Sequence, residues 1–133
     1  MSPKTILLVE DDPEDAELTI RALKDVLKPY ALKVARDGVE AAELLSDEGG
    51  LPVLILLDLN LPRVNGMELL EQLNQKWGPE LRGVTVAILS SSFEGGEREA
   101  ARKLGARTHI RKPISLEQTA VMVREVSSLL RGA

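Results

Sequence analysis

The chain of 133 residues contains no cysteine. This absence excludes disulfide bonds, thiolate metal sites and cysteine nucleophiles, and it makes a reducing compartment tolerable. The N-terminus lacks the charged start, long apolar run and cleavage site of a signal peptide. The longest apolar run, residues 53–57, is far shorter than the roughly 20 residues of a membrane helix. We therefore expect a cytoplasmic protein without a membrane segment.

Aromatic residues are also scarce, since Tyr30, Trp77 and Phe93 make up only 2% of the sequence. The core must therefore be aliphatic, and stacking of bases on aromatic side chains is not expected. The formal net charge of −4 provides no broad basic surface either. Both features argue against nucleic acid as a partner.

The chain does contain a regular alternation of short apolar runs with longer segments of helical periodicity. The predicted strands are residues 6–9, 32–35, 53–57, 84–89 and 106–110, and the predicted helices are residues 13–26, 39–46, 66–75, 94–104 and 115–130. The runs 54–57 and 86–89 are apolar throughout, as in strands that helices cover on both faces. The pattern predicts an α/β fold with a doubly wound, five-stranded parallel sheet, in one domain (residues 1–133) without an output domain.

Acidic side chains gather where the predicted strands end. Glu10, Asp11 and Asp12 follow the first strand, and Asp58 follows the third. Because strands one and three are neighbours in the common doubly wound order, these carboxylates are expected to converge. Their repulsion requires a proton or a cation, and an all-oxygen site suits Mg²⁺. Asp12, directly before a proline, is predicted to cap the first helix instead.

A hydroxyl and an ammonium group are expected at the same edge, because Ser90 and Lys112 follow the fourth and fifth strands. Around a phosphorylated aspartate, Lys112 would neutralise phosphoryl oxygens and Ser90 would donate a hydrogen bond to one of them. The acidic turn after the first strand disfavours nucleotide binding, which needs a glycine-rich loop. The only histidine, His109, lies within the fifth predicted strand, which argues against a Ser-His-Asp triad.

Five segments, in order along the chain, resemble the receiver domains of two-component response regulators. They are residues 6–12 (ILLVEDD), 56–62 (LLDLNLP) with Gly66 following, 88–91 (ILSS), 104–106 (LGA) and 112–113 (KP). The resemblance extends from residue 4 to residue 130 and implies the (βα)5 flavodoxin-like receiver fold. It also implies a phosphorylation switch, and not an enzyme that turns over an external substrate.

The resemblance implies a role for the residues around the phosphoryl group. Asp58 is expected to be the phosphoacceptor, which takes a phosphoryl group from a histidine kinase or a phosphotransfer protein. Ser90 is expected to be the switch hydroxyl and Lys112 the phosphate-contacting lysine, aimed by a cis bond to Pro113. His109 stands where many receivers carry a switch Tyr or Phe, which makes an aromatic gate doubtful.

The resemblance also implies a Mg²⁺ site. Asp11, Asp58 and the main-chain carbonyl of Asn60 are expected to bind the ion, and Glu10 is expected to act largely through water. The segment 8–15 (LVEDDPED) is similar to the small regulators that accompany bacterial phytochromes. A bacteriophytochrome kinase is therefore an expected partner.

The last predicted helix has more apolar surface than one face requires. One stripe is formed by Leu116, Ala120, Val123 and Leu130, and a second by Met122, Val126 and Leu129. The second stripe belongs either to a deeply packed helix or to a surface for a partner. As a surface, it predicts a homodimer through the fourth helix, the fifth strand and the fifth helix.

Two other functions stay open at this stage. A pseudo-receiver would bind partners without phosphorylation, but the retained Asp11, Asp58 and Lys112 argue against this function. A hydrolase that uses the same carboxylate and metal would need an external substrate and a pocket, which the sequence does not indicate.

Overall fold

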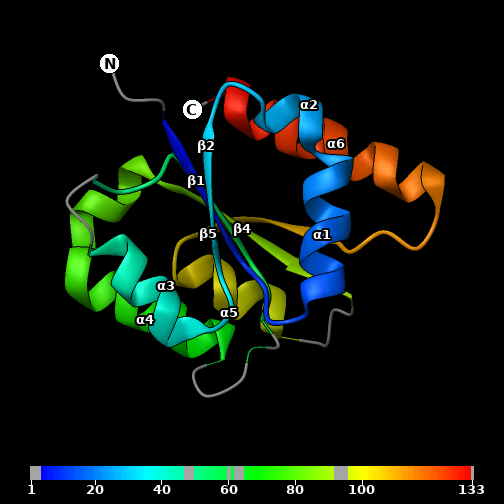
Figure 1. Ribbon diagram of the computed structural model, residues 1–133. Coiled ribbons are helices and arrows are strands. Elements are labelled where there is room, and N and C mark those ends of the chain that lie inside the picture. Colours follow the sequence, from blue (N-terminus) through cyan, green and yellow to red (C-terminus); the bar gives the residue numbers. More distant parts are fainter. Residues whose placement is uncertain (1–3, 47–49, 60, 62–64, 92–95, 133) are drawn as a thin grey trace.

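The computed structural model describes residues 4–46, 50–59, 61, 65–91 and 96–132. Its centre is a five-stranded parallel sheet with the order β2-β1-β3-β4-β5 (Figure 1). The strands are β1 (Thr5–Val9), β2 (Ala31–Ala35), β3 (Leu54–Leu57), β4 (Thr85–Ser90) and β5 (Ala106–Arg111). Their ends agree with the predicted ends within one residue, and β1 and β3 are neighbours as expected.

Helices cover both faces of the sheet (Figure 1). One face carries α1 (Pro13–Ala22), α2 (Lys24–Leu27) and α6 (Leu116–Arg131), and the other carries α3 (Gly38–Leu45), α4 (Gly66–Trp77) and α5 (Glu97–Lys103). A short 3-10 helix, η1 (Gly78–Gly83), follows α4. The predicted doubly wound receiver fold is confirmed.

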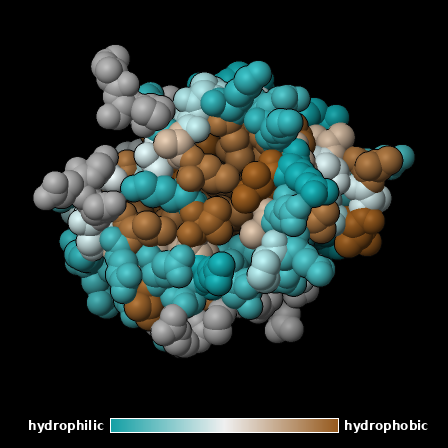
Figure 2. All heavy atoms as spheres, viewed as in Figure 1, coloured by the Kyte–Doolittle hydropathy of each residue, from teal (hydrophilic) through white to brown (hydrophobic). Residues whose placement is uncertain are grey.

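Each face of the sheet has its own hydrophobic core, because successive strand residues point to opposite faces. Leu7 and Val9 pack with α3, α4 and α5, whereas Ile6 and Leu8 pack with α1, α2 and α6. β3 and β4 are buried at every position, as their apolar sequences predicted. At the edge strand β2 the core is less completely covered, and Figure 2 shows hydrophobic side chains between this strand and the helices α1 and α2.

Two predicted helices differ from the structure. The first, residues 13–26, is divided because Leu23 leaves the helical path (φ −95°, ψ 6°) and α2 begins after it. Leu23 and Leu27 are nevertheless both buried, so the predicted apolar face is retained. The fourth helix was predicted from residue 94, but residues 92–95 lie outside the described ranges, and α5 begins at Glu97.

Of the two alternatives for the second stripe of the last helix, deep packing is confirmed and the partner surface is wrong. Met122 and Val126 are 1% exposed and belong to the core beneath α6, and Leu129 packs against this core. Leu116, a member of the first stripe, is 90% exposed because the first turn of α6 extends past the sheet (Figure 1). Helical periodicity identified two stripes but could not tell which one meets the sheet. The predicted homodimer therefore loses the apolar surface on which it depended.

Candidate functional site

The loop after β1 brings one acidic side chain into the protein and leaves two outside. The Glu10 N–H donates to the carbonyl of Ala35, and the Glu10 side chain is buried. Asp11 and Asp12 are exposed. Asp12 caps α1, since its carboxylate accepts hydrogen bonds from the main-chain N–H of Glu14 at 2.9 Å and of Asp15 at 3.4 Å. The predicted capping role of Asp12 is confirmed.

Asp58 directly follows β3 and is 4% exposed. Its main-chain N–H donates to the carbonyl of Val9 at 3.1 Å, which fixes the end of β3 against β1. Carboxylate oxygens of Glu10, Asp11 and Asp58 lie within 4.8 Å of one another. The convergence predicted from the strand order is therefore present.

These three carboxylates fit a hard divalent cation. The donor set is all oxygen, which suits Mg²⁺ or Mn²⁺. Glu10 Oε1 is buried, and the Lys112 ammonium group lies 2.6 Å from it. One ammonium group does not neutralise three carboxylates, so a further cation would stabilise the cluster. Asn60, predicted to add its carbonyl, lies outside the described residues.

Lys112 supplies positive charge to the same cluster. Its Nζ lies 2.6 Å from Glu10 Oε1, 3.0 Å from Asp58 Oδ2 and 3.1 Å from Asp15 Oδ2. The Lys112 main-chain N–H donates to the carbonyl of Ser90 at 2.9 Å, which ties the ends of β4 and β5 together. No peptide bond of the described residues is cis, so the cis Lys112–Pro113 bond implied above is wrong, although the lysine still reaches the carboxylates.

Burial and charge shift two pKa values in this cluster. Burial raises the pKa of Glu10 to about 7, and the Asp58 carboxylate adds to the rise while Lys112 opposes it. Burial lowers the pKa of Lys112, but the carboxylates of Glu10 and Asp58 more than offset this and raise it above its ordinary value. Lys112 is therefore charged at physiological pH, and the cluster keeps excess negative charge when Glu10 is ionised.

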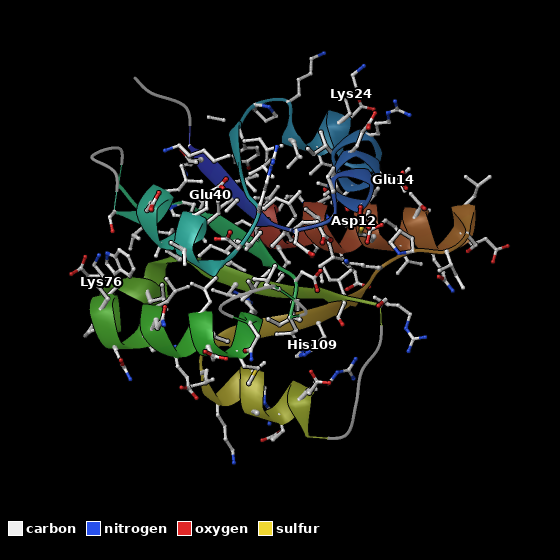
Figure 3. The ribbon with its side chains drawn as sticks, turned by 60° about the horizontal axis from the view of Figure 1, so that its bottom comes forward. Asp12, Glu14, Lys24, Glu40, Lys76 and His109 are labelled. Carbon is white, nitrogen blue, oxygen red and sulfur yellow. The ribbon has the colours of Figure 1, made fainter. Side chains whose placement is uncertain are left out.

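Ser90 and His109 occupy neighbouring strands. Ser90 is the last residue of β4 and is 1% exposed. Because Leu57 pairs with Ile88, Asp58 and Ser90 leave neighbouring strands at the same edge of the sheet. His109 lies in β5, as predicted, on the side that faces α5 (Figure 3), and burial followed by the charge of Arg98 lowers its pKa.

The roles of two residues were not predicted, although both lie in segments quoted above. Asp15 contacts Lys112 from the first turn of α1. Its place at the start of a predicted helix beside the acidic cluster was an available signal, but the position of α1 against the Lys112 loop was not. Gly66 begins α4 so close to the site that a Cβ added there would lie 2.6 Å from the Asp58 carbonyl oxygen and 2.6 Å from Leu59 Cα.

An apolar groove adjoins Lys112. It has a volume of about 550 Å³ and lies between α1 and the segment that joins β5 to α6. Three large hydrophobic side chains on it are strongly exposed: Leu18 (62%), Ile114 (88%) and Leu116 (90%). Exposed apolar groups of this size are typical of a surface that contacts another protein.

Within the described ranges, no helix is long and apolar enough to cross a membrane.

Comparison with known proteins identifies relatives over nearly the whole chain. The response regulator receiver domain family matches residues 6–124. The response regulator Rcp1 of Synechocystis sp. is 34% identical over 131 residues, which cover 95% of this chain and 88% of Rcp1. The crystal structure of the Mn²⁺-bound form of Rcp1 superposes with a TM-score of 0.80 over 95% of this chain and 93% of that one.

Two further solved structures are similar. The phosphorylated cyanobacterial phytochrome response regulator RcpA has a TM-score of 0.83 at 32% identity and covers 99% of this chain and 97% of its own. The bacteriophytochrome response regulator AtBRR has a TM-score of 0.74 at 35% identity, and the match covers 94% of this chain and 93% of AtBRR.

Proposed function

The chain belongs to the response regulator receiver domain family of two-component signal transduction, and on this premise we propose that its phosphoacceptor is Asp58. The observation that carries the proposal is the contact of 3.0 Å between the buried Asp58 carboxylate and the Lys112 ammonium group. A carboxylate in this position can attack phosphorus, and the same ammonium group can neutralise the phosphoryl oxygens of the product.

The proposed reaction is in-line transfer from a phosphohistidine. An Asp58 oxygen attacks phosphorus opposite the P–N bond, which breaks as the new O–P bond forms, and the histidine nitrogen keeps the bonding electron pair. Lys112 holds a phosphoryl oxygen while this occurs. Ser90, buried at the end of the neighbouring strand, is proposed to donate its hydroxyl hydrogen to another phosphoryl oxygen after transfer. Formation and loss of the aspartyl phosphate then switch the protein-interaction surface between two states.

The proposed cofactor is Mg²⁺, held by Asp11 and Asp58, by the Asn60 carbonyl, and by Glu10 through water. A bound divalent cation would neutralise charge on the phosphoryl group during transfer. The all-oxygen cluster of Glu10, Asp11 and Asp58, with more carboxylates than one lysine can neutralise, supports this assignment. The Mn²⁺-bound form of Rcp1 shows that a relative with this fold binds a divalent cation.

The protein is proposed to assist its own phosphorylation and dephosphorylation, without turnover of an external substrate. Phosphorylation of the relative RcpA favours this function over a pseudo-receiver that acts without phosphorylation. The hydrolase considered above is not favoured, because the groove beside Lys112 is apolar where it is most exposed and lies outside the carboxylate cluster.

The proposed phosphoryl donor is a histidine kinase, of the bacteriophytochrome class, or a phosphotransfer protein. The names of the relatives RcpA and AtBRR support the bacteriophytochrome assignment. The apolar groove supports an approach of this partner along α1, because Lys112 forms part of its lining. A donor histidine seated there would lie next to the phosphoacceptor.

Three further predictions stay proposals. The alignment with Rcp1 covers 95% of this chain and 88% of Rcp1, which supports a single receiver domain over residues 1–133. A cytoplasmic location remains the expectation from the cysteine-free sequence. Homodimerisation through α5, β5 and α6 remains a prediction, although the apolar stripe that first suggested it is buried in the core.

The experiment that tests the phosphoacceptor uses phosphoramidate, a small phosphoryl donor, with Mg²⁺. We expect the wild-type chain to gain one acid-stable, alkali-labile phosphoryl group, and an Asp58→Asn variant to gain none. Asp12→Asn is the matched control, because Asp12 caps α1 and contributes no oxygen to the three-carboxylate cluster. Full incorporation in the Asp58 variant would refute the assignment.

A further inference from the structure

Among the residues that the structure describes, Lys112 contacts three carboxylates, and these contacts are not equivalent. The side chains of Glu10 and Asp58 are 1% and 5% exposed, whereas the side chain of Asp15 is 43% exposed. Glu10 and Asp58 belong to the acidic cluster, and Asp15 lies outside it on α1. We propose that Asp15 is a positioning residue, which holds the Lys112 ammonium group in place for phosphoryl transfer. This inference rests on the proposed function of Asp58.

The geometry matches the chemistry of an ammonium group, which has three N–H donors and no acceptor. The three carboxylates surround Nζ from three separate segments: the loop after β1, the end of β3 and the first turn of α1. Lysine has a long, flexible side chain, and two partners would leave one of its three donors without a carboxylate. Asp15, at 3.1 Å, accepts a hydrogen bond from the ammonium group and can serve as the partner of that third donor.

Asp15 is itself well placed to act as a fixed anchor. It belongs to α1, a helix of 10 residues whose start is capped by the Asp12 side chain. The Asp15 main-chain N–H is one of the two that donate to this cap. The Asp15 carboxylate therefore projects from an ordered helical turn, and it contacts a lysine that is 97 positions away in the sequence.

The partners of Lys112 differ in what the reaction does to them. Phosphorylation converts the Asp58 carboxylate into an acyl phosphate, and that oxygen no longer carries its charge. Glu10 faces the cation site, so its charge is shared when a cation binds. Asp15 takes part in neither event. It is therefore the one contact that can hold Nζ unchanged while another N–H donor moves from Asp58 to the phosphoryl group.

The test compares Asp15→Asn, Glu14→Gln and Asp15→Glu with the wild-type chain. Glu14 is the matched control, because it is an exposed acid on the same helical turn and is not among the ion-pair partners of Lys112 in the described structure. Each protein is phosphorylated by phosphoramidate, whose P–N bond breaks as the Asp58 O–P bond forms and whose nitrogen leaves as ammonia. The initial rate is measured over a series of Mn²⁺ concentrations, with a thermal melt to confirm folding.

We expect Asp15→Asn to lower the rate at saturating Mn²⁺ by about two- to fivefold, the size of effect for a partly exposed charged contact. Glu14→Gln should leave the saturated rate unchanged, and Asp15→Glu should restore most of it. If the only effect were the loss of one negative charge, both Asp15→Asn and Glu14→Gln would raise the half-saturating Mn²⁺ concentration. Their rates at saturating Mn²⁺ would then equal the wild-type rate.

Two results would overturn the inference while leaving the phosphoacceptor assignment in place. One is a saturated rate for Asp15→Asn equal to the wild-type rate. The other is an equal loss of rate in all three variants, which would indicate a general effect of altering this turn. Failure of the wild-type chain to incorporate phosphate would refute the proposed function itself, and the inference with it.

Discussion

Glu10 is the residue at which burial and charge conflict most directly. In the metal-free protein its pKa is raised from 4.5 to about 7, mainly by burial. The folded state then holds the proton more tightly than the unfolded state does. The stability that this group contributes is therefore complete below about pH 4.5 and is lost as pH rises through 7.

A Glu10→Gln variant tests this account. We expect the wild-type chain in a metal chelator to lose stability relative to the variant by on the order of 2 kcal/mol between about pH 5 and pH 8. Mg²⁺ should reverse the loss in the wild-type chain alone, because the ion compensates an ionised Glu10. The free energy of unfolding in urea, measured across this pH range, provides the comparison. Parallel pH profiles of stability for the two proteins would contradict a raised pKa of Glu10 in the folded state.

At the same scale, the sequence predicted which residues form the site better than it predicted their contacts. Glu10, Asp11 and Asp58 could be predicted to converge because strand order alone brings the ends of β1 and β3 together. The contact between Asp15 and Lys112 could not be predicted. It depends on how α1 lies over the loop after β5, and no short-range pattern encodes the relative position of two elements so distant in sequence.

The start of α4 shows how one element supports the site. Gly66 is not among the glycines with a positive φ, so helix propensity would favour alanine there, by at most about 1 kcal/mol. An added Cβ would however lie 2.6 Å from two main-chain atoms, the Asp58 carbonyl oxygen and Leu59 Cα. Main-chain atoms cannot move aside as easily as the end of a flexible side chain. Overpacking of this kind costs about 1–3 kcal/mol, so the clash should prevail.

We therefore expect Gly66→Ala to destabilise the protein by about 1–2 kcal/mol and to slow phosphoryl uptake, because the Asp58 main chain must shift. Gly83→Ala is the matched control, since a Cβ at Gly83 would meet nothing within 4 Å. Urea unfolding and phosphoramidate labelling measure the two effects. A Gly66→Ala variant that resembles the control in both would show that the close approach is relieved at little cost.

The helix α6 provides a second comparison at this scale. Val126 is 1% exposed and Val121 is 41% exposed on the same helix. A buried glutamate is costly, so Val126→Glu should lose at least about 3 kcal/mol of stability, whereas Val121→Glu should lose little. Thermal unfolding with sedimentation at micromolar concentration separates the possibilities. If Val126→Glu folded normally and only converted a dimer to a monomer, the original interface prediction would be correct and the packing described above would be wrong.

The predicted elements agreed with the structure where hydrophobic pattern alone determines them. The strands were predicted to within one residue because their apolar runs are bounded by polar or glycine-containing turns. The division of the first helix at Leu23 was not predicted, since no proline or glycine marks it. Whether the second stripe of α6 is buried could not be decided for a related reason: periodicity relates residues within a helix and carries no reference to the sheet.

At the scale of the whole molecule, the apolar groove should distinguish phosphorylation of Asp58 by a protein donor from phosphorylation by a small molecule. If a protein donor approaches along α1 as proposed, it occupies the groove, whereas a small donor need not. We expect Ile114→Glu to slow phosphotransfer from a bacteriophytochrome histidine kinase by about tenfold, because an apolar contact is replaced by a charge. The rate with phosphoramidate should be unchanged.

Val39→Glu is the control for this variant, since Val39 is 41% exposed and belongs to α3 on the opposite face. It should leave both donors unaffected. Equal slowing of the two donors by Ile114→Glu would indicate damage to the Lys112 segment, and no slowing with the kinase would exclude the groove as its docking surface.

The scarcity of aromatic residues has a practical consequence for how this switch can be observed. Trp77 ends α4, about 16 Å along the helix from Gly66, next to Lys76, which lies far from Asp12 in Figure 3. Its ring is in contact with the Lys76 ammonium group, 4.7 Å from the ring centre. Intrinsic tryptophan fluorescence should therefore follow unfolding of the α4 side of the core and remain nearly silent when Asp58 is phosphorylated. Trp77 therefore reports folding and not signalling, and a tryptophan placed at the exposed position Leu116 in a Trp77→Phe chain would report phosphorylation instead.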